Sequence, residues 1–361
     1  MRNNKNRILS FRVQSDVRID ELLRSELPRA LGSPVSNSKI RRLVVAGAVC
    51  VDGRQVRVPS FSVRKGGSVS VSVDEEKLFF EKKPDDIAFE LSPSDVLFED
   101  DSVIVVNKPS MFPTEAGMVG SRDNLHDAVV RFLFAREKAR NPNMRNPPYV
   151  GIMHRLDRET SGAILFTKTR AANAPCHDMF ENHTARKTYR AVSTDCGCCF
   201  PLSEFPFSFA VSFPMGRISP KSQAAKWGKV STGGVDSLTE FTVLGRIDAG
   251  GKKAYAVECR PLTGRTHQIR AHMRHIGHPL FCVERYGGTE ILRGQRSSTY
   301  KAFIQNCFAL CPRQVLHAQT LGFRHPVTGE QMDFSSPLPS DMQAVIDKWR
   351  KYIHGNTSVQ S

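Results

Sequence analysis

The sequence has little of what a membrane or secreted protein needs. Its longest uncharged apolar run, Leu43 to Val51, is about half of the ~20 residues that cross a bilayer. Near the amino terminus only Ile8, Leu9 and Phe11 follow the first basic residues before polar ones return, which is not the apolar core of a signal peptide. We therefore expect a cytoplasmic protein without membrane association.

Signs of a disulfide framework, a metal site and a nucleotide cofactor are also scarce. The nine cysteines are an odd number in a long chain, which does not indicate secreted disulfides. Cys196, Cys198 and Cys199 lie close together, but a second Cys or His cluster at zinc spacing is missing. Glycine motifs that cradle phosphates are absent as well. The sequence thus predicts no metal and no cofactor.

Acidic residues are too few to balance the basic ones. The 361 residues include 51 Lys and Arg against 36 Asp and Glu, for a formal charge of +15 and an isoelectric point near 9.6. Such a balance is typical of nucleic-acid-binding proteins, although a basic surface can also serve solubility alone. The chain is longer than one ordinary domain core, so we expect two domains.

Residues 16–73 are predicted to form a small α+β unit. Asp16 can cap a first helix, whose apolar residues recur at helical spacing up to Gly32. A second helix begins near Ser38 and ends at Gly47. The side chains that this second helix directs away from its apolar face are basic: Lys39, Arg41 and Arg42. They are candidates for binding RNA phosphates, with a solvated helix face as the alternative.

Strand signals follow in the same unit. Residues 49–56 contain Asp52-Gly53 between short apolar runs, which predicts a hairpin. Valines at 69, 71 and 73 alternate with serines, as in a half-buried strand. Two helices with exposed basic residues and a short sheet would make a surface for RNA.

The rest of the chain divides into a linker, a large domain and a tail. Residues 74–93 are mixed in charge and lack a sustained period, which is typical of a linker. Residues 94–352 contain short β-rich runs without regular strand–helix alternation, so an α+β domain around a mixed, mostly antiparallel sheet is predicted. Helical patterns occur near 124–139, 171–182 and 266–276. Residues 353–361 are expected to be disordered.

One candidate for chemistry is the segment HRLDRETSG at residues 154–162, which leads into a hydrophobic run. Asp157 lies between Arg155 and Arg158, so the local charge favours its ionised form. A carboxylate is a poor choice for binding phosphates, which would repel it. This favours a chemical role for Asp157, while an ordinary surface ion pair is the alternative.

A second candidate is the segment LTGRTHQIR at residues 262–270. Arg265 follows a glycine and opens a helical stretch, from which a guanidinium can reach a carboxylate or a phosphate. Histidines at 267, 272, 275 and 278 raise a metal alternative, but arginines interleave with them and would repel a divalent ion. A zinc-supported structural protein is the alternative that these residues leave open.

Together the segments resemble the RluA-type family of pseudouridine synthases. The similarity rests, in order, on NKPS at 107–110, HRLDRETSG at 154–162, KTY at 187–189, TGRTHQIR at 263–270, and LHA at 316–318 with HP at 325–326. It covers about residues 95 to 335. The chain departs from the family pattern at Cys282-Val283, where Gly-Asp is usual. Residues 16–73 resemble the S-four module of RNA-binding proteins, with Asp52 and Gly67 as mild departures.

The resemblance implies an RNA pseudouridine synthase that needs no cofactor or metal. Asp157 would be the catalytic carboxylate and Arg265 would keep it ionised. Tyr189 would stack on the uracil and could assist the final removal of the proton from ring carbon 5. The resemblance also implies that Arg155 fills the place of the flipped base. The further RNA-contacting residues that it implies are Lys108, Lys39, Arg41, Arg42 and Arg270. We expect a monomer whose substrate is large-subunit ribosomal RNA, with tRNA as the second candidate. A non-catalytic RNA-binding or ribosome-assembly protein is the alternative.

Overall fold

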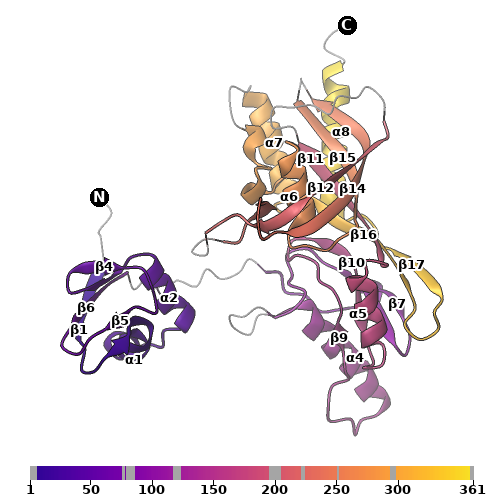
Figure 1. The fold of residues 1–361 in the computed structure, drawn as a ribbon. Coiled ribbons are helices and arrows are strands. Elements are labelled where there is room, and N and C mark those ends of the chain that lie inside the picture. Colours follow the sequence, from indigo (N-terminus) through magenta and orange to yellow (C-terminus); the bar gives the residue numbers. More distant parts are fainter. Residues whose placement is uncertain are drawn as a thin grey trace. The chain divides into compact units, whose positions relative to one another are not determined.

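The structure is a computed structural model of the whole chain (Figure 1). It describes residues 6–74, 78, 86–116, 123–194, 205–220, 224–249, 252–292 and 298–357. The chain forms two compact units, the first comprising Met1–Pro84 with Pro220–Ala224 and the second comprising Asp85–Ser219 with Ala225–Ser361. None of the described helices combines the length and apolar character needed to span a membrane.

The first unit packs two helices against a four-stranded sheet of order β1-β6-β3-β4. The helices are α1 (Ile19–Leu31) and α2 (Asn37–Val45). The strands are β1 (Asn6–Arg12), β2 (Val17–Arg18), β3 (Val49–Val51), β4 (Arg54–Val56), β5 (Ser62–Val63) and β6 (Ser68–Asp74), with β2 and β5 paired separately. The predicted hairpin is confirmed, because β3 pairs antiparallel with β4 across Asp52 and Gly53, both at positive φ.

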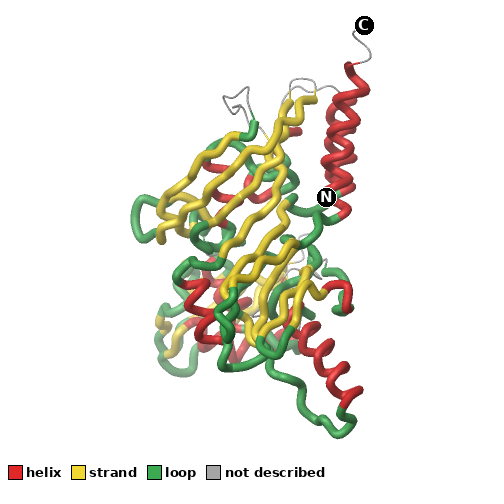
Figure 2. Tube along the Cα trace, turned by 90° about the vertical axis from the view of Figure 1, so that its right-hand side faces the viewer, coloured by secondary structure: helices red, strands yellow, loops and turns green. Residues whose placement is uncertain are grey.

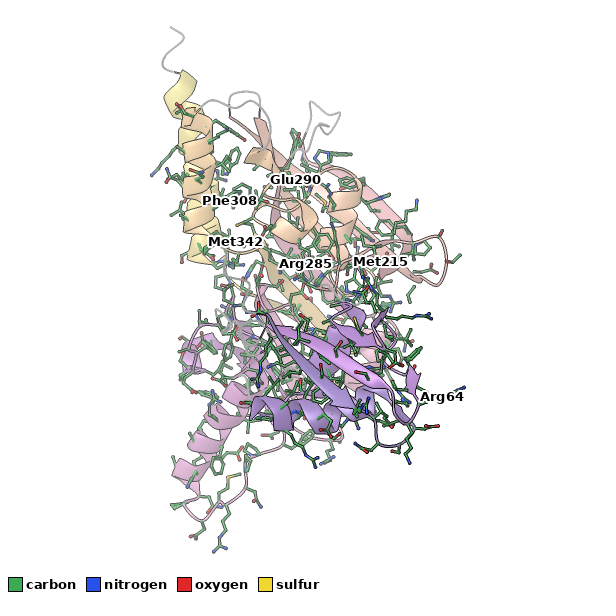
Figure 3. The ribbon with its side chains drawn as sticks, turned by 90° about the vertical axis from the view of Figure 1, so that its left-hand side faces the viewer. Arg64, Met215, Arg285, Glu290, Phe308 and Met342 are labelled. Atoms are coloured by element: carbon green, nitrogen blue, oxygen red, sulfur yellow. The ribbon has the colours of Figure 1, made fainter. Side chains whose placement is uncertain are left out.

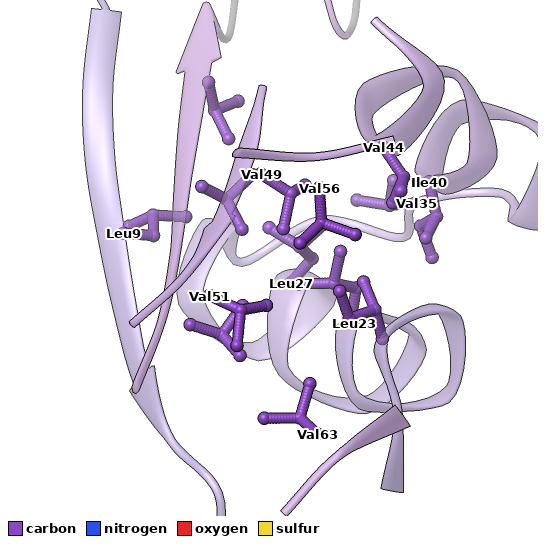
Figure 4. Packing of buried hydrophobic residues seen from close by; sticks show 14 of the residues in the cluster. Leu9, Leu23, Leu27, Val35, Ile40, Val44, Val49, Val51, Val56 and Val63 are labelled. Carbon is purple, nitrogen blue, oxygen red and sulfur yellow. The ribbon is translucent and has the colours of Figure 1, made fainter. Parts of the chain in front are cut away.

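The core of this unit comes from the apolar faces of both helices and the sheet (Figure 4). Leu23 and Leu27 of α1 are fully buried, and Ile40 and Val44 of α2 lie in the same cluster. The three valines of β6 have no exposed surface. The alternating pattern of β6 therefore faces the core as the sequence predicts.

Two features of the first unit differ from the sequence-based expectation. The unit begins before residue 16, because β1 pairs with the whole of β6. Asp16 does not cap α1; its Oδ1 accepts a hydrogen bond from the backbone N–H of Lys65, and Arg18 occupies the cap position. The helix ends at Gly32 in the left-handed conformation, which glycine adopts without strain.

The second unit is built on a large sheet of order β13-β12-β14-β15-β11-β16-β10-β8-β7, with β17 beside β16 and β9 beside β10 (Figure 2). Its pairs are antiparallel except β10 with β16. The strands are β7 (Val96–Glu99), β8 (Val103–Lys108), β9 (Gly151–Ile152), β10 (Ser161–Thr167), β11 (Arg186–Thr194), β12 (Phe207–Arg217), β13 (Trp227–Lys229), β14 (Val235–Ala249), β15 (Lys252–Pro261), β16 (Leu316–Arg324) and β17 (Gln331–Ser335). The α+β class with a mixed, mostly antiparallel sheet is confirmed.

Helices cover this sheet. They are α4 (Leu125–Arg140), α5 (Asn173–Glu181), α6 (Gln268–His275), α7 (Ser298–Leu310) and α8 (Ser340–Thr357), with short 3-10 turns at Pro93–Asp95, Glu284–Tyr286 and Glu290–Leu292. Phe308 of α7 and Met342 of α8 belong to one core cluster that also contains Trp349 (Figure 3). The sequence analysis predicted the first three helices and missed α7 and α8.

Strand β10, which follows the Asp157 loop, is buried on both faces. Ile164 and Phe166 belong to the cluster that contains the buried face of α4, whereas Ala163 and Leu165 belong to the cluster that contains Cys176 of α5. A strand covered on both faces reads as a continuous apolar run. The carboxyl end of the Asp157 loop is therefore fixed in the interior of the unit.

The predicted linker and tail need correction. Residues 86–93 of the expected linker are part of the second unit, where Phe89 packs on Phe112 and Ile87 donates a backbone hydrogen bond to Met111. The expected tail at 353–361 is helical up to Thr357, because α8 continues to that residue. Within residues 194–235, β12 and β13 form regular antiparallel strands, with β13 at the edge of the sheet. Cys196, Cys198 and Cys199 lie outside the described residues.

Candidate active site

The Asp157 loop lies between β9 and β10 in the sequence. The two ends of β10 pair with different strands, β16 and β9. Residues 161 and 162 pair with β16, and residues 166 and 167 pair with β9. Between them the backbone N–H of Leu165 donates to Nε2 of His154 at 3.0 Å. Burial and the charge of Lys187 lower the pKa of His154 to about 3, so its neutral ring completes the strand edge as an acceptor.

Gly162 allows β10 and β16 to approach closely. Its φ is +120°, and a Cβ at this position would lie 2.1 Å from the carbonyl oxygen of Ala318. Only glycine fits such a conformation and such an approach. The Ser-Gly end of the motif thus anchors the loop by backbone geometry, and Oγ of Ser161 bonds Nδ1 of His317 at 3.0 Å.

Two buried cations hold the backbone that follows Asp157. Nζ of Lys108 donates to the carbonyl oxygens of Pro109, Arg158 and Thr160 at 2.8, 3.1 and 2.8 Å. Nη1 of Arg313 donates to the carbonyl oxygen of Glu159 at 3.1 Å. Three successive carbonyls of the loop are therefore bound by cations from other parts of the chain.

Lys108 is consequently not an RNA-binding residue, which corrects the sequence-based assignment. Its side chain has no exposed surface. Burial lowers its pKa to about 7, and its three carbonyl partners match the three N–H donors of the charged form. A group enclosed in this way cannot reach a phosphate, so its part in the site is to fix the loop.

The carboxylate of Asp157 is bound by Arg270 from α6. Nη2 of Arg270 lies 2.6 Å from Oδ2 of Asp157, and the two side chains are 9% and 34% exposed. The guanidinium also lies 5.6 Å from the ring centre of Tyr286, a favourable cation–π arrangement. A charged hydrogen bond in a partly enclosed site is stronger than a surface ion pair.

Arg265 does not take this role, contrary to the expectation. Its side chain is exposed, and its Nε donates to the backbone carbonyl of Asp236 at 3.1 Å. The reason is local geometry: His267 is left-handed at φ 60° and α6 begins only at Gln268. Arg265 thus precedes the helix, while Arg270 lies in its first turns on the buried side.

Tyr189 comes from β11 and lines the same cavity as Asp157. It packs against the two core clusters on either side of the strand. Burial, together with the negative charge of Asp157, raises the pKa of Tyr189 well above its usual value. Its hydroxyl therefore stays protonated at neutral pH.

The cavity that holds these residues has a volume of about 1010 Å³. Asp157, Tyr189 and Arg270 line it together, and Arg265 and Arg155 lie on its lining as well. Arg155 is exposed and pairs with the carboxylate of Glu115. The carboxylate of Asp157 therefore lies beside the guanidinium of Arg270, in a space of the size that ligand pockets usually have.

Tyr286 contacts two residues of the α6 segment, Arg270 and His267. Its hydroxyl accepts from the backbone N–H of Trp227 and bonds Nδ1 of His267, both at 2.9 Å. Val283, at the departure from the family pattern, is buried in the same core cluster as Tyr286. The replacement therefore adds an apolar side chain to the core.

The histidines of the α6 segment do not form a metal site. His272 is fully buried, and its Nε2 bonds Oγ of Ser237 at 2.8 Å. Burial lowers the pKa values of His267 and His272 to about 4. Among the described residues, the ligand atoms that come close enough for a metal are those of the exposed group His177, Asp178 and Glu181.

Lys39, Arg41 and Arg42 lie on α2 of the first unit, as predicted. Arg41 and Arg42 are exposed and Lys39 is half-buried. The residues that the sequence analysis missed are Arg313 and Lys187. Arg313 stands three residues before the LHA motif, and this proximity is the signal that could have revealed it.

The fold and the site define an enzyme for a negatively charged substrate, with one carboxylate held by a guanidinium inside a cation-lined cavity. Residues 102–275 match the family described as RNA pseudouridylate synthase. Ribosomal large subunit pseudouridine synthase D of Zymomonas mobilis is 31% identical to this chain, over 91% of this chain and 94% of that protein. RNA pseudouridine synthase 2, chloroplastic, of Oryza sativa is 30% identical, over 88% and 77% of the two chains.

A solved structure supports the fold. Human RNA Pseudouridylate Synthase Domain Containing 4 is similar with a TM-score of 0.52 at 20% identity, over 71% of this chain and 93% of that one. The chain belongs to the RNA pseudouridylate synthase family and is an isomerase that acts on RNA.

Proposed function

We propose that the protein converts specific uridines of large-subunit ribosomal RNA into pseudouridine, with Asp157 as its catalytic carboxylate. The observation that carries the assignment of Asp157 is its 2.6 Å hydrogen bond to Arg270 inside the cation-lined cavity. Binding alone has no use for a carboxylate at that place, because phosphates repel it. The ribosomal substrate is supported by relatives named ribosomal large subunit pseudouridine synthase D; tRNA is the second candidate.

The reaction breaks the bond between N1 of uracil and C1′ of ribose, turns the base, and forms the bond from C5 to C1′. The proton at C5 leaves and N1 gains one, so no group is added or lost. The uridine must first leave its stack to reach the cavity. Arg155, exposed at the cavity lining, would occupy the place that the base leaves.

Arg270 would orient the carboxylate of Asp157 toward the nucleotide. Tyr189 would stack on the uracil. Because its hydroxyl stays protonated, a phenolate is not at hand to remove the proton from C5. This favours Tyr189 as a stacking platform and leaves the proton transfer to Asp157.

The first unit would contribute affinity and choice of site. We infer this from the exposed arginines of α2 and from the location of every catalytic candidate in the second unit. The six described cysteines are free thiols, which supports a reducing compartment such as the cytoplasm. A monomer is the state that we propose.

The test of the function is Asp157→Asn. We expect it to abolish pseudouridine formation while RNA binding changes by no more than a few-fold, because no phosphate contact is removed. Mapping pseudouridines in total RNA from cells that lack the protein then identifies the substrate. Turnover by the Asn variant would reject Asp157 as the catalytic group, and a missing pseudouridine in tRNA alone would reject the ribosomal substrate.

A further inference from the structure

The active-site cavity contains a cation that the proposed chemistry does not use. Lys187 lies on β11 two residues before Tyr189, and both side chains line the cavity. In the part of the chain that the structure describes, no carboxylate forms an ion pair with its ammonium group. Burial lowers the pKa of Lys187. A desolvated charge without a counter-ion is unfavourable in a protein unless a ligand supplies one.

The space beside this ammonium is open. A Cβ built on Gly264 would have Nζ of Lys187 at 4.0 Å as its nearest neighbour. On another side, Nζ lies 5.6 Å from the ring centre of Phe180, which in turn stacks on His154. An aromatic ring and a neutral imidazole leave the charge of Lys187 uncompensated, and the missing side chain at Gly264 leaves room for a ligand.

A second cation stands next to that opening. Arg265 follows Gly264 directly and also lines the cavity. Its Nε is bound to the carbonyl of Asp236, which holds the side chain while its terminal nitrogens remain as further donors. A guanidinium and an ammonium on two sides of a glycine make a suitable pair for one oxyanion.

We propose that Lys187 and Arg265 bind one backbone phosphate of the RNA, next to the nucleotide that enters the cavity. This rests on the proposed function. Lys187 and Tyr189 are two residues apart on β11, about 6.6 Å along a regular strand, and both line the cavity. A nucleotide whose uracil stacks on Tyr189 carries its phosphate at that side of the base. The subsite would draw the flipped nucleotide into place and hold its sugar against Asp157.

The test uses the full chain and stem–loop RNAs that each carry a single neutral methylphosphonate linkage near the target uridine. For the unchanged protein we expect one linkage at which binding weakens about tenfold, as loss of one charged contact predicts. Lys187→Gln should bind the normal RNA more weakly and should lose less than the unchanged protein at that linkage, because Arg265 alone still contacts that phosphate. Lys187→Arg should keep the linkage dependence. Lys138→Gln is the matched control, because Lys138 also lies over a phenylalanine ring but outside the cavity.

Other results would overturn the subsite. Equal weakening of the unchanged protein and Lys187→Gln at every linkage would show that Lys187 binds no phosphate. A turnover loss above 100-fold at saturating RNA, with unchanged binding, would make Lys187 part of the chemistry instead. Binding is measured without turnover, so the linkage effect stands or falls separately from pseudouridine formation and from the Asp157→Asn result.

Discussion

Nη2 of Arg270 donates a hydrogen bond to Oδ2 of Asp157 at 2.6 Å, across 113 residues of sequence. Arg270 is itself nearly enclosed, with the ring of Tyr286 on one side. The pair therefore links the loop after β9 to helix α6 inside one cavity. It makes Arg270, and not Arg265, the residue that binds the carboxylate of Asp157.

Arg270→Met is expected to reduce the single-turnover rate at saturating RNA by about 100-fold or more, the usual effect of losing one electrostatic contact to a reacting group. Arg270→Lys should retain part of the rate, since it supplies charge without the planar guanidinium. Arg265→Met should weaken RNA binding and recover most of its rate at saturation. An equal loss at saturation in both Met variants would contradict the assignment to Arg270 alone.

Lys108→Met is expected to lower the free energy of unfolding by about 2–4 kcal/mol, because it leaves buried carbonyls of the catalytic loop without donors. Turnover should fall as the loop loses its position. Urea unfolding measures the first effect. Lys138→Met on the exposed part of α4 is the control, and should change stability by less than about 0.5 kcal/mol. A similar value for both variants would show that the three hydrogen bonds contribute little.

The stability of the fold should decrease in mild acid. Burial lowers the pKa values of His272 and His317 to about 4, while the unfolded chain takes up these protons near pH 6.5. The unfolded state thus binds more protons between pH 6.5 and pH 4. The stability present above pH 6.5 is lost as the pH falls through this window, by about 1.4 kcal/mol per pH unit for each histidine.

Urea unfolding at several pH values between 4.5 and 7.5 tests this expectation, since His317→Gln should give a shallower slope than the unchanged chain. The hydrogen bonds of His317 to Ser161 and to the carbonyl of Ser336 can be partly replaced by an amide. His177→Gln, at an exposed position, is the matched control. A slope that His317→Gln leaves unchanged would mean that the buried imidazole does not contribute to acid sensitivity.

Replacing Arg41 and Arg42 together by Gln should weaken RNA binding and leave turnover at saturation within a few-fold. If each contacts one phosphate, the slope of log affinity against log salt should fall by about 1.4 to 1.8. The control is the Arg324→Gln/Arg350→Gln double variant, two exposed positions of the second unit. An unchanged salt slope in the α2 variant would show that this helix does not meet phosphates.

Much of the fold followed from local patterns. The alternating valines of β6 and the Asp52-Gly53 turn predicted the sheet and hairpin of the first unit, because burial on one face and positive φ values leave clear sequence signals. Helices α7 and α8 were missed, although their amphipathic patterns are no weaker than those of α4 and α5. Strand β1 was also missed, because its partner β6 lies more than 50 residues away and pairing over such a distance leaves no local pattern.

The site was predicted in part, and the error is informative. Arg265 and Arg270 stand five residues apart in one motif, and both types of side chain suit a carboxylate. The left-handed conformation of His267 determines which arginine is buried. A histidine in the sequence does not predict that conformation. Lys108 was misassigned for a similar reason. A lysine next to a proline is expected to be exposed, and only the structure shows that it is buried at the end of β8.

The tie between Arg313 and the loop has a consequence for how the protein is made. Arg313 also forms a buried ion pair with Asp341 at the start of α8, at 2.7 Å. Asp157, Tyr189 and Arg270 all leave the ribosome before these two residues do. A nascent chain therefore carries Asp157, Tyr189 and Arg270 before Arg313 and Asp341 are available to hold the loop. Activity should appear only after Asp341 has been synthesised, so formation of the Arg313–Asp341 pair would set the onset of activity.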